Sequence, residues 1–339
     1  AALTTAQVVA LTTAQAVAIG TADIVALTTG QIQALTTANV AALTTTNLQA
    51  LSTAQIASLT TAQVVALGTT QVAGLSNSNV SGLTTAQVAA METADIAVVT
   101  TSNLRYLSSA QLAAVTTAQI AALTTAQVVA LTTDQVSNLT TQQIASLTTK
   151  QVVAMETDDV LAVTTAQLVT MTTAQAASLS TDQIQSLSTS QVSNLTTKQL
   201  AALTTAQVVA LTTYQLGNLT TAQLAAMTIK QVAVIETDDL QALTTAQLVT
   251  LTTAQMATLT TDQVVVLETA DLAPRLTRHS GGNPLFLEEL ATLVADGGHV
   301  ADLPDSLRTL VSARLDQLTP EQRAMIDNAA VLGSSGNLT

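Results

Sequence analysis

An unbroken period of eight residues is the feature that most constrains how this chain can fold. An apolar residue recurs at every eighth position from Leu3 to Leu267, about 34 times, without insertion or deletion. A second apolar position follows five residues after each of these, from Val8 to Leu272. The pattern fails at Arg275, so we expect two parts: a repeat array over residues 1–274 and a different, helical segment over residues 275–339. Such a regular repeat is typical of a solenoid or a fibre.

A continuous helix and a straight strand are both incompatible with this spacing. At roughly 100° per residue, each successive Leu position would drift by about 80° around a helix, so no apolar stripe would form. Residues five apart point to opposite faces of a strand. A β-coil that turned in every repeat would need corner residues, but glycine holds no fixed position in the octad.

A string of very short capped helices accounts for every position of the octad. With Thr4 as the N-cap, Gln7 falls at the third helical residue, and the two side chains form a capping box. Leu3 and Val8 then occupy the two positions of the hydrophobic staple. The predicted fold class is therefore all-α: a repeat solenoid of very short capped helices, followed by a small helical tail. The handedness and the number of octads per turn do not follow from the sequence; two octads per turn is one hypothesis.

Variation between octads predicts which positions face solvent. The position three residues after the Leu column accepts almost any side chain: Gly30, Asp134, Gln142, Lys150, Asp158, Asp182, Lys198, Tyr214, Lys230 and Asp262. The two apolar columns never carry a charge. The position just before the Leu column is small nearly everywhere, with Tyr106 as the main exception, and this predicts a close approach of neighbouring turns.

Composition and charge exclude several function classes. The chain is 48% hydrophobic, unlike a disordered polar tract, yet only 9% of its residues are charged, unlike an ordinary enzyme. A net charge of −13 argues against nucleic acid as a partner, and no apolar run approaches the ~20 residues of a membrane span. There is no cysteine, and the array contains no histidine. We therefore expect no catalytic residues and no cofactor, and so no enzyme. Because the sequence opens inside a repeat without Met, we take it for a fragment, which leaves export undecided.

Four octads carry acidic residues in place of the capping pair. Glu replaces the cap residue and Asp replaces Gln in Glu92 with Asp95, Glu156 with Asp159, Glu236 with Asp239, and Glu268 with Asp271. Their spacings are multiples of sixteen, so a turn of two octads would place them on one side of the solenoid. Three interpretations remain open. The acids lie favourably at helix N-termini, they form weak Ca²⁺ sites with backbone carbonyls, or they mark duplication of larger blocks.

The octads resemble the ALTTAQVx repeat arrays of large bacterial secreted or surface proteins, which are often described as adhesins or calcium-binding repeat proteins. This resemblance covers most of the chain. It implies a spacer or adhesive stalk at the cell surface or outside the cell. Its partners would be proteins or cell surfaces, and the stalk would self-associate laterally or end to end.

The tail resembles a different family. RLTRHSGGNPLFLEEL and LPDSLRTLVSARLDQLTPEQRAMIDNAAVLG are similar to the end of the ATPase module of bacterial multidomain signal-transduction ATPases, found in transcription regulators and attached to some adenylate cyclases. In that family the Gly-x-Pro element, here Gly282, Asn283 and Pro284, lies beside the nucleotide. The GxxxxGK[ST] phosphate loop and the acidic Mg²⁺ strand that should come before it are missing, so the motif is at most a remnant and no ATP hydrolysis is expected. Considered without the family resemblance, Gly282, Asn283 and Pro284 also fit a turn followed by a helix N-cap.

The favoured interpretation of the whole sequence is a non-enzymatic structural or interaction protein, a spacer or adhesive stalk. The alternative is the sensor or scaffold part of a signalling ATPase that lacks its catalytic core, which would be cytoplasmic. A third interpretation is that the two parts were joined by misassembly of the sequence.

Overall fold

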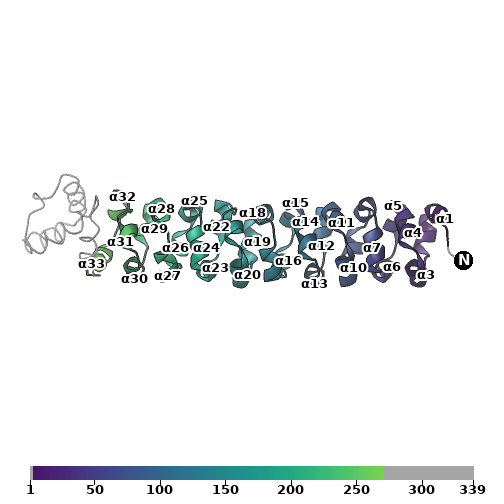
Figure 1. Cartoon of the computed structure of the whole chain (residues 1–339), viewed down its shortest axis with the longest axis horizontal. Coiled ribbons are helices and arrows are strands. Elements are labelled where there is room, and N and C mark those ends of the chain that lie inside the picture. Colours follow the sequence, from purple (N-terminus) through teal and green to yellow (C-terminus); the bar gives the residue numbers. More distant parts are fainter. Residues whose placement is uncertain (1–2, 270–339) are drawn as a thin grey trace, which may run out of the picture. The chain divides into compact units, whose positions relative to one another are not determined.

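The computed structural model describes residues 3–269, and the regular elements of this range are all α-helices. Contacts divide the chain into two units, Ala1–Leu187 and Ser188–Thr339. Each unit is a run of short helices, one for each octad (Figure 1). The predicted all-α repeat solenoid is confirmed for the described part of the chain, and the predicted helical tail over residues 275–339 lies outside it.

The first unit contains α1 to α23. Their bounds are α1 Thr5–Val9, α2 Thr13–Val17, α3 Thr21–Ala26, α4 Thr29–Ala34, α5 Thr37–Ala42, α6 Thr45–Ala50, α7 Thr53–Ser58, α8 Thr61–Val65, α9 Thr69–Ala73, α10 Asn77–Gly82, α11 Thr85–Ala90, α12 Thr93–Val98, α13 Thr101–Leu104, α14 Ser109–Ala114, α15 Thr117–Ala122, α16 Thr125–Val129, α17 Thr133–Ser137, α18 Thr141–Ser146, α19 Thr149–Ala154, α20 Thr157–Ala162, α21 Thr165–Leu168, α22 Thr173–Ser178 and α23 Thr181–Ser186.

The second unit contains α24 to α33 in its described part. Their bounds are α24 Thr189–Asn194, α25 Thr197–Ala202, α26 Thr205–Val209, α27 Thr213–Gly217, α28 Thr221–Ala226, α29 Ile229–Ala233, α30 Thr237–Gln241, α31 Thr245–Leu248, α32 Thr253–Met256 and α33 Thr261–Thr269.

The capping box starts most of these helices, as the sequence predicted. At α16 the backbone N–H of Thr124 donates to Gln127 Oε1 at 2.7 Å, and the backbone N–H of Gln127 donates to Thr124 Oγ1 at 3.2 Å. The helix before it, α15, ends at Ala122, and its C-cap residue Leu123 (φ −57°, ψ 139°) turns the chain into the next cap. Helices this short are unstable alone in water, so the array depends on packing between turns.

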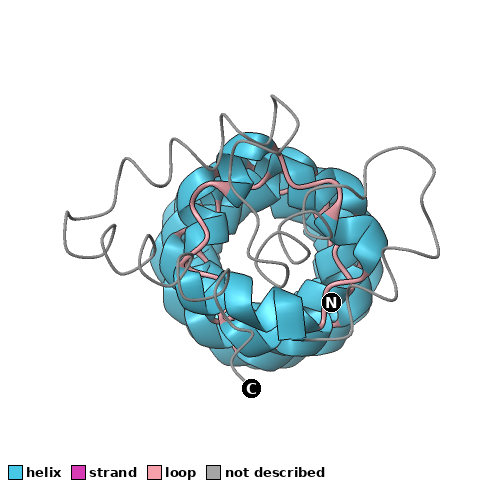
Figure 2. Cartoon of the chain, turned by 90° about the vertical axis from the view of Figure 1, so that its left-hand side faces the viewer, coloured by secondary structure: helices cyan, strands magenta, loops and turns pink. Residues whose placement is uncertain are grey.

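Each helix packs against the third helix along the chain. In the first unit α1 packs on α4, α2 on α5 and α12 on α15; in the second, α25 packs on α28 and α30 on α33. The helices nearest the viewer in Figure 2 accordingly form a ring. One turn therefore holds between three and four octads, and the hypothesis of two octads per turn is wrong. A ring of this size leaves room inside for the two apolar side chains that each octad turns inward.

The two apolar columns form the core, as predicted. Ile120 of the second column is fully buried, and Leu123 of the first is 6% exposed. Leu3 is 40% exposed, since the described residues include no turn before it. This agrees with a solenoid in which each turn is stabilised by its neighbours and the first turn is the least covered.

The predicted exposed and close-approach positions are both confirmed. All ten variable positions named above are exposed, Tyr214 most of all at 81%. The position before the Leu column meets the helix start one turn earlier: a Cβ atom built on Gly82 would lie 2.8 Å from Thr53 Cα. Small residues are needed there because the backbones nearly touch.

Candidate functional site

The Gln column does more than cap its own helix. The Gln127 Nε2 group donates to Val99 O at 2.7 Å and to Ile96 O at 2.8 Å, 28 and 31 residues earlier in the chain. The second unit repeats this geometry, since Gln231 Nε2 donates to Leu203 O and Leu200 O, both at 2.8 Å. Each such Gln therefore links one turn to the turn before it.

This role was not predicted from the sequence, although the sequence contains a signal for it. The column carries only Gln, Asn or Asp, and Glu never occurs there. A capping box alone would accept Glu as readily as Gln. Gln and Asn, which fill most of the column, can also donate a hydrogen bond to the carbonyl oxygens of the earlier turn, whereas a carboxylate cannot.

Asparagine makes the same link with a shorter side chain. The Nδ2 groups of four asparagines donate to the Leu-column carbonyl 28 residues earlier at 2.7–3.0 Å: Asn39 to Leu11, Asn47 to Ile19, Asn79 to Leu51 and Asn103 to Leu75. These octads show where an Asp side chain of equal length would place its second oxygen.

The acidic octads break the link. Glu92, Glu156 and Glu236 occupy the N-cap position of α12, α20 and α30, and none makes a side-chain cap hydrogen bond. Asp95 and Asp159 are each only 3% exposed, and the Oδ2 atom of each has no hydrogen-bond partner. A buried polar atom without a partner is unfavourable, typically by about 1–3 kcal/mol.

Burial changes the acidity of both aspartates. It raises the pKa of the Asp95 carboxyl above its ordinary value; a hydrogen bond from the Glu92 backbone opposes this shift, and the charge of Glu92 adds to it. Burial likewise raises the pKa of the Asp159 carboxyl, with an opposing hydrogen bond from the Glu156 backbone and additions from the charges of Glu156 and Asp158. In both cases the surroundings disfavour the ionised carboxylate.

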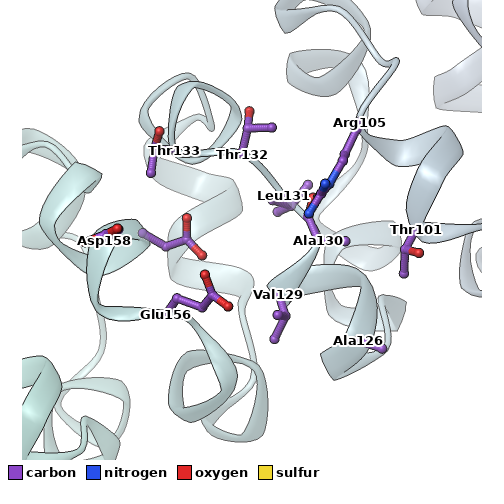
Figure 3. Close-up of a pocket in the computed structure, with 11 residues that line it drawn as sticks. Thr101, Arg105, Ala126, Val129, Ala130, Leu131, Thr132, Thr133, Glu156 and Asp158 are labelled. Atoms are coloured by element: carbon purple, nitrogen blue, oxygen red, sulfur yellow. The ribbon is translucent and has the colours of Figure 1, made fainter.

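A groove of about 450 Å³ lies beside Asp159. Its lining residues come from four helices and the segments between them: Thr101, Arg105, Ala126, Val129, Ala130, Leu131, Thr132, Thr133, Glu156, Asp158 and Asp159. Figure 3 shows Glu156 and Asp158 on one side of this groove and Arg105 on the other. The Arg105 Nε–H donates to Ala130 O at 2.9 Å, which holds the guanidinium at the groove wall.

The acidic pairs of the first unit do not share one side. The turn-to-turn hydrogen bond spans 28 residues. Glu92 and Glu156 are 64 residues apart, which exceeds two such steps by a whole octad. The expectation of a common acidic side, which rested on two octads per turn, is therefore wrong for this unit.

Several predicted site residues lie beyond what the structure describes. The side chain of Glu268 is not described, and Asp271, Gly282, Asn283 and Pro284 lie outside residues 3–269. Within that range, no three His, Cys, Asp or Glu side chains come together as a metal site. No helix of that range has the length and apolarity needed to cross a membrane.

Comparison with known proteins identifies the repeat. No curated protein and no solved structure matches the chain. The sequence profile of the ALTTAQ repeat, in contrast, matches residues 16–53, 40–77, 88–125, 120–149, 152–189, 185–213 and 232–269, which together make up more than half of the sequence. The chain belongs to the ALTTAQ repeat family.

Proposed function

We propose that the array is a non-enzymatic spacer, whose reach is set by the number of octads. The observation that carries this proposal is the Gln link, which joins turn after turn with the same geometry. Gln63 reaches Leu35 O at 2.6 Å, and Gln151 reaches Leu123 O at 2.7 Å. Because the link repeats in this way, each further turn lengthens the array without changing its cross-section.

The distribution of chemical groups supports the same role. Apart from Asp95, Asp159 and Asp239, the buried polar side chains of the described residues are amides, and an amide neither transfers protons nor attacks a substrate. The exposed position three residues after the Leu column varies among charged, polar and aromatic residues. This variation favours a surface that need not recognise one ligand.

Distances between labels within the first unit test the spacer. Because the chain has no cysteine, introduced cysteines are unique labelling sites. One dye at Asp182→Cys is paired in turn with a second at Ala126→Cys, Thr70→Cys or Ala14→Cys; all four positions are exposed. These pairs span two, four and six steps of 28 residues. Packed helices lie 8–10 Å apart, so each pair should add roughly 16–20 Å by single-molecule energy transfer.

The outcomes separate a spacer from other roles. Proportional growth of the distance supports the spacer, and a plateau after the first pair would contradict it. Deleting seven octads, which is two steps, should remove one increment. Replacing the exposed variable residues by Ala should leave the distances unchanged. An adhesive stalk, by contrast, would lose binding to its surface on that replacement.

A further inference from the structure

Backbone carbonyls converge on the amide group of each linking Gln. The Gln55 Nε2 atom lies 2.8 Å from Leu27 O, 3.1 Å from Ile24 O and 3.3 Å from Val25 O. Gln63 and Gln87 each meet three carbonyls in the same way. Each turn thus presents a group of oxygens to a partly positive nitrogen of the next turn.

The acidic octads place a carboxylate oxygen before the same group of oxygens. By the repeat register, Asp95 faces the carbonyls of Val64, Val65 and Leu67, and Asp159 those of Val128, Val129 and Leu131. Asn103, of the same length as Asp, brings its Nδ2 atom to 2.8 Å from Leu75 O. An ionised Asp has no hydrogen to donate, and the Oδ2 atoms of Asp95 and Asp159 are left without a partner.

Glutamate recurs beside the aspartates of the Gln column. Every Glu of the array lies three residues before an Asp of this column. Helix capping does not explain this association, because Glu92 and Glu156 make no cap hydrogen bond.

The resulting ligand set suits a hard divalent cation. Ca²⁺ binds carboxylate and carbonyl oxygens at 2.3–2.6 Å, and a ligand separation of about 3 Å fits two oxygens around one ion. At α20, Glu156, Asp158 and Asp159 line one groove together with Val129 and Leu131 (Figure 3). Within residues 3–269 no side-chain cluster could hold a metal ion alone, so an ion here would also need carbonyl oxygens of the earlier turn.

We propose that the octads of Glu92–Asp95 and Glu156–Asp159 each bind one Ca²⁺ ion between successive turns. The ion takes the place of the Gln amide: it binds the carbonyl oxygens of the earlier turn and the carboxylates of the later one. The array then contains two kinds of link, one permanent and one that depends on the cation concentration. This inference does not depend on the spacer role.

Calorimetric titration of the full chain with CaCl₂ in chelator-treated buffer tests the assignment. The D95N/D159N variant should bind two fewer Ca²⁺ ions than the wild type. It should still fold, because Asn makes the direct link that Asn79 and Asn103 make. The matched control D134N/D182N removes two charges from exposed positions and should bind as many ions as the wild type. Mg²⁺ and K⁺ titrations show whether the sites prefer Ca²⁺.

Thermal unfolding provides a second readout. Ca²⁺ should raise the Tm of the wild type and of the control more than that of D95N/D159N, because an ion that binds only the folded state stabilises it. Equal stoichiometry in the wild type and D95N/D159N would overturn the proposal. So would an absence of binding at millimolar Ca²⁺, which would leave a proton or a water molecule as the partner of the buried oxygens.

Discussion

The octads of Gln127 and Asp159 begin with the same extended N-cap backbone but carry an amide and a carboxylate at the same position. At α16 the Gln127 amide closes the contact between turns with two hydrogen bonds of 2.7 and 2.8 Å. At α20 the Asp159 carboxylate leaves one buried oxygen unpartnered beside an open groove. The fold therefore needs each octad to begin a helix, but it does not need the same hydrogen bonds between turns in every octad. Some turns carry a complete link, and others supply only acceptors.

The largest expected effect comes from removing the donor from a complete link. The Q127E substitution keeps the oxygen that accepts from the Thr124 backbone, but it sets a buried charge against the carbonyls of Ile96 and Val99. We expect a loss of about 3 kcal/mol in the free energy of local opening. Native-state hydrogen exchange at the backbone amides of Val128 and Leu131, in calcium-free buffer, measures it.

A matched variant in the first turn sharpens this result. Gln7 makes the capping box with Thr4 but is exposed, and the described residues include no turn before it. The Q7E substitution should therefore change stability by less than about 0.5 kcal/mol. Equal losses at the two positions would show that capping, and not the link between turns, is what the column provides.

The next effect concerns Asp95 in calcium-free buffer. Its pKa is raised in the folded chain above the ordinary value of 3.8, mainly by burial. The folded state therefore retains the proton at pH values where the unfolded chain has lost it. The stability from this proton is complete below pH 3.8 and is lost as the pH rises through the folded pKa. Glu92 is the titratable neighbour on its own helix, and the helices α9 and α15 that pack against α12 carry none.

The D95N variant removes this titration and supplies a permanent donor. At neutral pH we expect it to be more stable than the calcium-free wild type by about 1 kcal/mol, because a buried acceptor gains a partner. Below pH 3.8 the two proteins should converge, since the protonated Asp95 can also donate. Urea unfolding at several pH values measures the difference, and a gap that does not depend on pH would refute the link between protonation and stability.

The smallest expected effect involves Arg105, whose charge faces the acidic side of the Asp159 groove. In the R105Q variant the side chain should keep its hydrogen bond to Ala130 O, since Gln49 makes the equivalent bond to Gly74 O at 2.6 Å. Loss of the cation should tighten Ca²⁺ binding at this groove about threefold at low salt. Titration of R105Q in a D95N background isolates the site. Unchanged affinity would mean that Arg105 lies too far from the ion to matter.

Interactions within one octad were predictable; of those between turns, only the close approach at the position before the Leu column was predicted. The capping box of Thr124 with Gln127 and the burial of Ile120 and Leu123 follow from eight neighbouring residues. The size of the turn depends on the bend at each Leu and on contacts 28 residues away, which no local pattern encodes. The hypothesis of two octads per turn failed for this reason, and the linking role of Gln was overlooked.

The acidic pairs illustrate the same division. The sequence alone showed that Glu92 accompanies Asp95 and that Glu156 accompanies Asp159. It did not show that both aspartates are buried or that the carbonyls of an earlier turn face them. The proposed Ca²⁺ ligands include backbone carbonyl oxygens. Every residue type has such an oxygen, so the sequence does not reveal which ones take part.

The 28-residue step has a consequence for how such genes change length. The step of 28 residues equals three octads plus four residues, and each Gln lies four residues after a residue of the Leu column. A Gln therefore always faces the Leu column of the earlier turn, whichever octads supply the two residues. Recombination that adds or removes whole octads preserves every pairing of columns, whereas a frame-preserving change of any other size breaks all the pairings that span it. We therefore expect the number of repeats to change by whole octads, because only such changes keep the pairing of columns intact.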